Sequence, residues 1–365
     1  MTIEEELKLK LPNNLKPLLS QRDGGALLAA ELPKTVTPAQ ASDAKSDLQR
    51  AWELCGLYYR DQGRLYEAQA IFHSLYNQML TYQEEAHKRV HKGMPLVWIS
   101  DFHASLGHPA LARRYIMLTT CEDAIRDEGT IPPGTTGVYF RAVWQYGISH
   151  HELLHYAQAI WNLSQEHPEE ARYPEWILQE IGNDWITEYP SPSEILRYEI
   201  STRYAQWLLG QLGDGTGEHL ERLAHYILES MPGCRAYRRK RSQSTDYDVV
   251  CTLEGPNDDF RSELGRYFIC ECKDWSRPAD FEAFAKFCRV LDSAKCRFGI
   301  LFSREGITGV GKTKDAEREQ LKVFQDRGMV VIVITEQDLH EVAGGANLIT
   351  MIRSKYESVR LDLRK

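Results

Sequence analysis

The chain has 365 residues, which is enough for two domains that each bury a core of their own. Its hydrophobic content of 42% is that of a globular protein, and no apolar run approaches the ~20 residues of a membrane-spanning helix. The net charge of −8 lies before residue 213, because residues 213–365 carry 25 basic and 25 acidic side chains, and an acidic surface is a poor candidate for binding a phosphate backbone.

Residues 1–45 combine several prolines with small polar residues, which predicts a partly ordered N-terminal arm. The first six residues are acidic and lack the basic and then apolar form of a signal peptide. Six of the eight cysteines lie from Cys234 onward without a CxxC pair, and Cys270 and Cys272 fall in an apolar strand. Buried thiols are therefore expected rather than disulfides or zinc ligands, and we expect a cytoplasmic protein that does not bind membranes.

Residues 46–212 have helical patterning and few strand signals. The segment from Ala51 to Leu80 resembles a tetratricopeptide repeat, in which small residues let two helices approach closely. The matching positions are Trp52, Gly56, Tyr59, Ala68 and Phe72. A weaker unit over residues 94–121 keeps Gly107, Ala112 and Ile116, and a third over residues 136–161 keeps Gly147. We expect a repeat-like helical domain that also needs the helices of residues 174–209, because so few repeats rarely stand alone.

Within this domain, His151-Glu152-Leu153-Leu154-His155 matches HExxH, the helix motif of zinc proteases. Two imidazoles one helical turn apart share a face, and the glutamate could act as a general base. No downstream Glu or His stands in a recognisable third-ligand motif, however, and Leu153 and Leu154 suit a packing helix. Exposed or interface histidines are favoured, with a zinc metallopeptidase as an alternative.

Glycines 210, 213, 215 and 217 mark a boundary, so a second domain is expected over residues 213–365. An amphipathic helix begins near Gly217, carries Glu221 and ends before Met231-Pro232-Gly233. Strands are then predicted over residues 235–241, 249–253 and 267–273, followed by a helix over residues 280–291 and a strand over residues 297–303.

Charged residues cluster at the ends of two of these strands. Asp248 precedes the second strand, and Glu271 and Lys273 end the third strand on one face, because side chains alternate along a strand. A turn between the two strands would bring the three side chains together. Two carboxylates and a lysine can hold a hard divalent cation and position a water.

These residues resemble the D…ExK signature of the PD-(D/E)XK nuclease superfamily, specifically its Mrr-like restriction endonuclease branch. The expected order of helix, three strands, helix and strand is similar to the αβββαβ core of that family, over residues 213–365. Glu221 stands where the family carries a glutamate on the helix before its first strand. Tyr247 replaces the proline of the family name, at a position that the superfamily often varies.

The resemblance implies a Mg²⁺ site, in which Mn²⁺ may substitute, formed by Asp248, Glu271 and the backbone carbonyl of Cys272. Glu221 would complete the metal environment directly or through water. Lys273 would orient or deprotonate the attacking water. Asp246 is a rival for the role of Asp248.

Two further segments bear on phosphate binding. The basic run that includes Arg238, Arg239, Lys240 and Arg241 predicts either a DNA-backbone contact or a charged strand edge. The segment from Gly306 to Thr313 matches the Walker A pattern, but only 52 residues follow it, too few for the rest of a P-loop sheet. We favour a glycine-bearing loop after the fourth strand, with Lys312 as a phosphate contact.

The sequence thus predicts a multidomain α and α/β protein, with a tetratricopeptide-like helical array before a restriction-endonuclease-like core. The expected activity is metal-dependent hydrolysis of DNA, by analogy in a prokaryotic restriction or antiphage defence effector whose helical domain binds a protein partner or regulatory subunit. Many nucleases of this kind dimerise, so a homodimer is a further expectation. A non-cleaving protein that binds nucleic acid or scaffolds partners is the main alternative, and the choice between DNA and RNA stays open.

Overall fold

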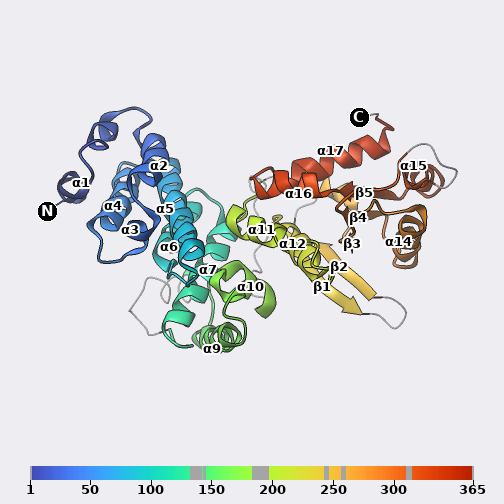
Figure 1. Cartoon of the computed structure of the whole chain (residues 1–365), viewed down its shortest axis with the longest axis horizontal. Coiled ribbons are helices and arrows are strands. Elements are labelled where there is room, and N and C mark those ends of the chain that lie inside the picture. Colours follow the sequence, from blue (N-terminus) through green and yellow to red (C-terminus); the bar gives the residue numbers. More distant parts are fainter. Residues whose placement is uncertain are drawn as a thin grey trace. The chain divides into compact units, whose positions relative to one another are not determined.

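The computed structural model describes residues 2–131, 142, 145–182, 197–241, 246–255, 260–309 and 315–363. The chain divides into two compact units, Met1–Glu188 and Tyr189–Lys365 (Figure 1). In the described residues the first unit is helical and the second is mixed α/β, as the sequence predicted. The sequence predicted a boundary after residue 212, whereas the observed boundary follows Glu188. The helix α11 (Thr202–Leu209) belongs to the second unit because it packs against other helices of that unit. None of the described helices combines the length and apolar character of a membrane-spanning segment.

The first unit is built from helices that pack on their neighbours in sequence. They are α1 (Ile3–Lys10), η1 (Lys16–Ser20), α2 (Gly24–Thr35), α3 (Pro38–Ser42), α4 (Asp47–Asp61), α5 (Leu65–Ala86), α6 (Gly93–Ser105), α7 (Pro109–Arg126), α9 (His150–Glu166), η3 (Glu170–Arg172) and α10 (Pro174–Ile181). Residues 132–141 and 143–144, which include part of the expected third repeat unit, lie outside the described residues.

Residues 1–45 were expected to form a partly ordered arm, and this expectation is wrong. The segment forms α1, η1, α2 and α3, and it contributes fully buried leucines such as Leu7, Leu28 and Leu32 to the core. The prolines do not prevent these helices, and Pro33 lies within α2. Pro38 occupies the first turn of α3, where a missing backbone N–H costs no hydrogen bond.

The helices α4 and α5 pack through the residues that the repeat pattern predicted. Trp52 is fully buried and donates a hydrogen bond from Nε1 to the carbonyl oxygen of Ile71, at 3.1 Å. Gly56 lies so close to Phe72 that an added Cβ would stand 2.1 Å from Cε2 of the ring. A residue without a Cβ is therefore required at position 56 for these helices to approach each other this closely.

A buried ionic cluster joins α7 to the segment between α5 and α6. Glu122 and Lys92 are 1% and 0% exposed, and Lys92 Nζ lies 2.9 Å from Glu122 Oε1. Arg89 donates a hydrogen bond from Nη2 to Glu122 Oε2 at 2.6 Å. Burial would raise the pKa of Glu122, but the charges of Arg89 and Lys92 outweigh it and hold the pKa at about 2.

The second unit contains a five-stranded mixed sheet in the order β1-β2-β3-β4-β5. The pairs β1–β2 and β2–β3 are antiparallel, and β3–β4 and β4–β5 are parallel. After α11 the elements are α12 (Glu218–Glu229), β1 (Cys234–Arg241), β2 (Asp246–Leu253), α13 (Arg261–Leu264), β3 (Tyr267–Lys273), α14 (Phe281–Ser293), β4 (Phe298–Ser303), α15 (Ala316–Arg327), β5 (Val330–Ile334), α16 (Glu336–Ala343) and α17 (Leu348–Arg360).

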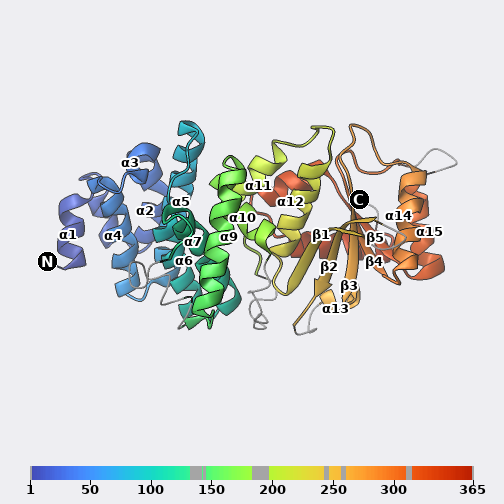
Figure 2. The ribbon, with the colours of Figure 1, turned by 90° about the horizontal axis from the view of Figure 1, so that it is seen from below.

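Alternating side chains divide the sheet into two buried faces. Ile269 of β3 and Leu301 of β4 pack in one core cluster with Phe284 and Phe287 of α14. On the opposite side α12 lies against β1, β2 and β3, as Figure 2 shows. Because Glu271 and Lys273 are two and four residues beyond Ile269, they share the face that α14 covers. The strand therefore carries its charged residues past the end of an apolar core.

Candidate functional site

The predicted site lies where β2 begins and β3 ends. The antiparallel register pairs Val249 with Cys270, so Asp248 and Glu271 are the next residues on each strand. The backbone N–H of Cys272 donates a hydrogen bond to Asp248 Oδ2, at 2.8 Å. The two carboxylates are therefore brought together by strand pairing, as the sequence predicted.

Lys273 completes this group from the same strand. Its Nζ lies 2.5 Å from Glu271 Oε1, and both side chains are largely buried, at 19% and 16% exposed. The ammonium group also lies 5.3 Å from the ring centroid of Trp275, within the range of a cation–π interaction. These contacts limit how far the lysine can move from the two carboxylates.

The group of Asp248, Glu271 and Lys273 contains two carboxylates and one amino group, so negative charge is not fully balanced within it. Burial and the nearby charge of Glu271 raise the pKa of Asp248 to about 6, although the Cys272 amide and Lys273 both oppose this change. The charge of Glu221 on α12 adds to the increase. A carboxyl whose pKa is raised by neighbouring carboxylates gains the most from a bound cation.

Oxygen atoms dominate the donors, as magnesium requires. Asp248 and Glu271 supply carboxylates, and the Cys272 carbonyl follows the amide that is bonded to Asp248. Burial and the same carboxylates raise the pKa of the Cys272 thiol, so the sulfur stays neutral and is no ligand for a soft metal. The residues present therefore fit a hard cation such as Mg²⁺ or Mn²⁺.

Glu221, expected to complete the metal environment directly or through water, lies near this group and pairs with an arginine. Its Oε2 accepts a hydrogen bond from Arg239 Nε at 2.6 Å. Within the described part of the chain, the carboxylate oxygens of Glu221, Asp248 and Glu271 do not all lie within 4.8 Å of one another. The glutamate is close enough to affect the charge of Asp248 but pairs with an arginine.

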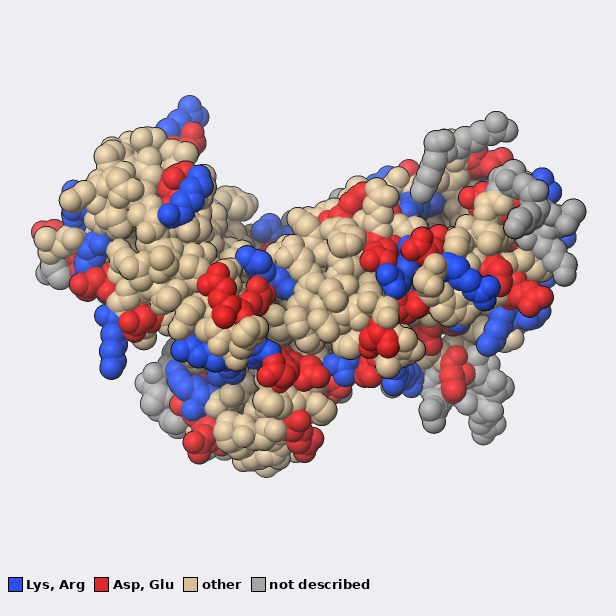
Figure 3. Space-filling view, viewed as in Figure 1, with Lys and Arg blue, Asp and Glu red and all other residues tan. Residues whose placement is uncertain are grey.

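The residues that were predicted to bind DNA are placed differently from one another. Arg239 is half-exposed beside the site, whereas Arg238 is 18% exposed and lies 3.9 Å from a carboxylate oxygen of Glu218. The side chains of Lys240 and Arg241, and the whole of Lys312, lie outside the described residues. On the face that Figure 3 shows, described basic and acidic side chains are interspersed. Asp246, the rival of Asp248, is exposed at the first position of β2.

A second set of contacts at the end of β3 was missed by the sequence analysis. The Asp274 carboxylate accepts hydrogen bonds from the Gly213 backbone N–H, at 2.9 and 3.1 Å. Arg304 pairs with Asp274 at 3.4 Å and with Glu336 at 2.7 Å. These residues are far apart in sequence, and no local pattern signals their contact. They hold the connection between α11 and α12 against the residue that follows Lys273.

The HExxH segment forms the first turns of α9. Ser149 caps this helix by accepting a hydrogen bond from the Glu152 backbone N–H, at 3.1 Å. His151 and His155 are exposed, and Leu153 is buried. Among the described residues, neither histidine belongs to a cluster of three side chains that could hold a metal. The Ser149 cap and the exposure of both histidines favour a capped surface helix over a zinc site.

The Walker-like segment follows β4, as expected, and residues 310–314 lie outside the described part. The next helix, α15, has Asp315 as its N-cap, with its carboxylate on the Glu317 backbone N–H at 2.9 Å. This acidic cap occupies the helix end that would otherwise attract a phosphate.

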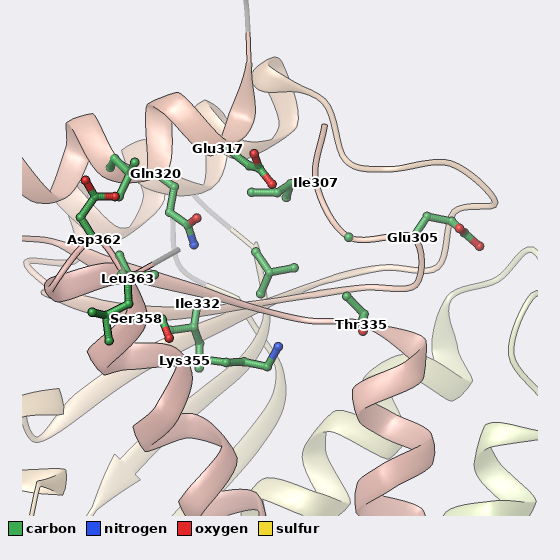
Figure 4. Close-up of a pocket in the computed structure, with 14 residues that line it drawn as sticks. Glu305, Ile307, Glu317, Gln320, Ile332, Thr335, Lys355, Ser358, Asp362 and Leu363 are labelled. Carbon is green, nitrogen blue, oxygen red and sulfur yellow. The ribbon is translucent and has the colours of Figure 1, made fainter. Parts of the chain in front are cut away.

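Beside this segment lies a pocket of about 420 Å³ between α15, β5 and α17 (Figure 4). Acidic side chains of Glu305, Glu317 and Asp362 contribute to its lining. Its lysine, Lys355, pairs with Asp338 at 2.8 Å. An acidic lining with a neutralised lysine is a poor receptor for a nucleotide phosphate.

Comparison of the chain with protein-family models, with curated proteins and with solved structures found no significant match.

Proposed function

We propose that the second unit is a metal-dependent nuclease that hydrolyses DNA phosphodiester bonds, on a restriction-endonuclease-like αβββαβ core. The observation that carries this proposal is the meeting of Asp248, Glu271 and Lys273 at adjoining strand ends, with Asp248 bonded to the Cys272 amide. The element order α12-β1-β2-β3-α14-β4 supports it, with the single turn of α13 between β2 and β3.

Each residue has a role that follows from its position. Asp248, Glu271 and the Cys272 carbonyl would hold Mg²⁺, which when bound would supply a Lewis acid for the phosphate and the leaving oxygen. Lys273 would hold the attacking water through Nζ and, in its neutral amine form, accept the proton of that water as the water oxygen bonds to phosphorus. The water oxygen forms the new bond to phosphorus, the bond to the leaving oxygen breaks, and that oxygen takes up a proton from solvent.

The helical unit suits a regulatory role. Its α4–α5 pair has the buried Trp52, Gly56 and Phe72 contacts of a tetratricopeptide-like array, a kind of surface that binds protein segments. By analogy alone, we propose a cytoplasmic restriction or antiphage defence effector that a protein partner or regulatory subunit controls. A homodimer that cuts both strands is part of the same proposal.

The test is a plasmid cleavage assay with the full chain, with Mg²⁺, with Mn²⁺ and with a chelator. Lys273→Ala should abolish metal-dependent nicking, because it removes the group that holds the water. Lys286→Ala, on the exposed face of α14, is the matched control for loss of a lysine. Glu152→Ala tests the peptidase motif, and its nicking rate should equal that of the wild type.

Wild-type rates in Lys273→Ala would contradict the assignment. DNA binding without cleavage by any variant, with or without metal, would favour the non-cleaving alternative on the same fold. Zinc retained by the purified wild type and lost in His151→Ala would revive the metallopeptidase alternative.

A further inference from the structure

Arg239 has an unusual backbone for a residue within a strand. Its φ is +50°, in the left-handed region that residues with a side chain rarely adopt. The register pairs Arg238 with Val249 and Lys240 with Tyr247, so Arg239 stands opposite Asp248. A strained conformation beside a group of charged residues is typical of a site where a side chain must be aimed.

Within the described residues, the guanidinium group of Arg239 makes a hydrogen bond through its Nε alone. Its Nε donates to Glu221 Oε2 at 2.6 Å, and no other described residue accepts a hydrogen bond from its guanidinium. Arg239 is 53% exposed and Glu221 is 14% exposed, so a largely buried carboxylate fixes an arginine that reaches toward solvent. The Nη1 and Nη2 groups, which together bind a phosphate in a bidentate manner, are left without a described acceptor.

The charges around Arg239 explain why a nuclease would need it. Asp248 and Glu271 lie at adjoining strand positions and Glu221 pairs with Arg239 from α12, so three carboxylates lie near one lysine, Lys273. Arg239 interacts electrostatically with Glu221 and with Asp248. A phosphodiester that approaches these carboxylates is repelled unless fixed positive charge faces it.

We propose that Arg239 binds the non-bridging oxygens of the scissile phosphate through Nη1 and Nη2, while Nε remains on Glu221. Glu221 is then a positioning residue for the arginine and not a ligand of the metal. This inference rests on the proposed nuclease function and assigns its phosphate-binding residue. It also explains why Glu221 stands apart from the two carboxylates at the strand ends.

The test compares three properties of the full-length protein. Affinity for a labelled DNA duplex is measured in a chelator, Mn²⁺ affinity is measured by calorimetry without DNA, and kcat and KM are measured with Mg²⁺. The variants are Arg239→Ala, Arg239→Lys and Glu221→Gln. Arg235→Ala is the matched control, because Arg235 lies on the same strand and pairs with Glu254 at 3.2 Å.

Arg239→Ala should weaken DNA binding about tenfold and lower kcat by roughly 10²–10³-fold, as expected for loss of a group that stabilises charge in the transition state. Arg239→Lys should recover most of the affinity but little of kcat, since an ammonium group lacks the bidentate fork. Glu221→Gln should leave Mn²⁺ affinity within about twofold of the wild type while lowering kcat about tenfold. Arg235→Ala should match the wild type in all three properties.

Arg239→Gly separates the chemical effect from misfolding. Glycine tolerates a φ of +50°, so this variant should unfold at or above the wild-type temperature and still lose kcat as Arg239→Ala does. A wild-type kcat in Arg239→Ala would overturn the role of the arginine. A tenfold or greater loss of Mn²⁺ affinity in Glu221→Gln would instead make Glu221 a metal ligand. If the wild type cuts no DNA, the nuclease proposal fails, and the two affinity measurements still decide the roles of Arg239 and Glu221.

Discussion

At the scale of single residues, ionisation of Asp248 lowers the stability of the folded state. Its carboxylate accepts a hydrogen bond from the Cys272 amide, which favours ionisation. Burial and the neighbouring carboxylates outweigh this contact and raise the pKa to about 6. The unfolded chain ionises this group near pH 3.8, so the folded state loses stability as the pH rises through about 6.

Asp248→Asn should therefore stabilise the metal-free protein at pH 7.5. The amide oxygen can still accept from Cys272, and the repulsion is removed, so we expect a gain of about 1 kcal/mol after allowing for solvent screening. At pH 4 the wild-type carboxyl is protonated in the folded state, and the gain should disappear. Thermal unfolding at the two pH values measures this. Asp246→Asn, at an exposed position of the same strand, is the control, and an equal gain in both variants would contradict the explanation.

At the scale of elements, the strand that carries Glu271 and Lys273 was predicted with its observed bounds. A short apolar run that ends in charged residues is compatible with few secondary structures other than a buried strand. The contact between Asp248 and the third strand followed from antiparallel pairing of two strands joined by a turn. The pairing of Arg239 with Glu221 did not follow, since it depends on one residue of β1 adopting a positive φ. Sequence patterns report alternation along a strand, but they do not report a local departure from it.

The α4–α5 pair offers a test of element packing. Gly56→Ala raises helix propensity, yet the added methyl group would overlap the Phe72 ring, so we expect a loss of about 1–3 kcal/mol in stability. Adding Phe72→Leu should return part of the loss by making room for the methyl group. A double-mutant cycle from chemical denaturation measures this coupling. Additive effects would show that the two residues do not share a contact.

At the scale of the whole molecule, two compact units imply two cores that unfold separately. Helical patterning over residues 46–212 and strand signals beyond residue 213 already indicated a helical part and an α/β part. They did not indicate that residues 1–45 belong to the helical core, because a segment with several prolines and small polar residues resembles a linker. They also did not indicate α11 as part of the second unit, since its contacts with α12 and α16 are set by tertiary structure.

Glu122→Gln tests the separation of the two units. The substitution leaves the buried Lys92 and the partly buried Arg89 without their charged partner, at a cost of about 3 kcal/mol or roughly 10 °C for the first unit alone. Differential scanning calorimetry should show one transition lowered and the other unchanged. Glu85→Gln, at an exposed position of α5, should change neither. A joint decrease of both transitions would mean that the units unfold as one.

The hydrogen bonds between Gly213 and Asp274 make the connection between α11 and α12 a mechanical part of the site. Asp274 follows Lys273 directly, so movement of this connection must either break two hydrogen bonds or pull on the strand end that carries the lysine. Arg304 pairs with the same carboxylate and is itself paired with Glu336. A force that displaces the connection between α11 and α12 would thus be transmitted to the end of β3 through the Asp274 side chain.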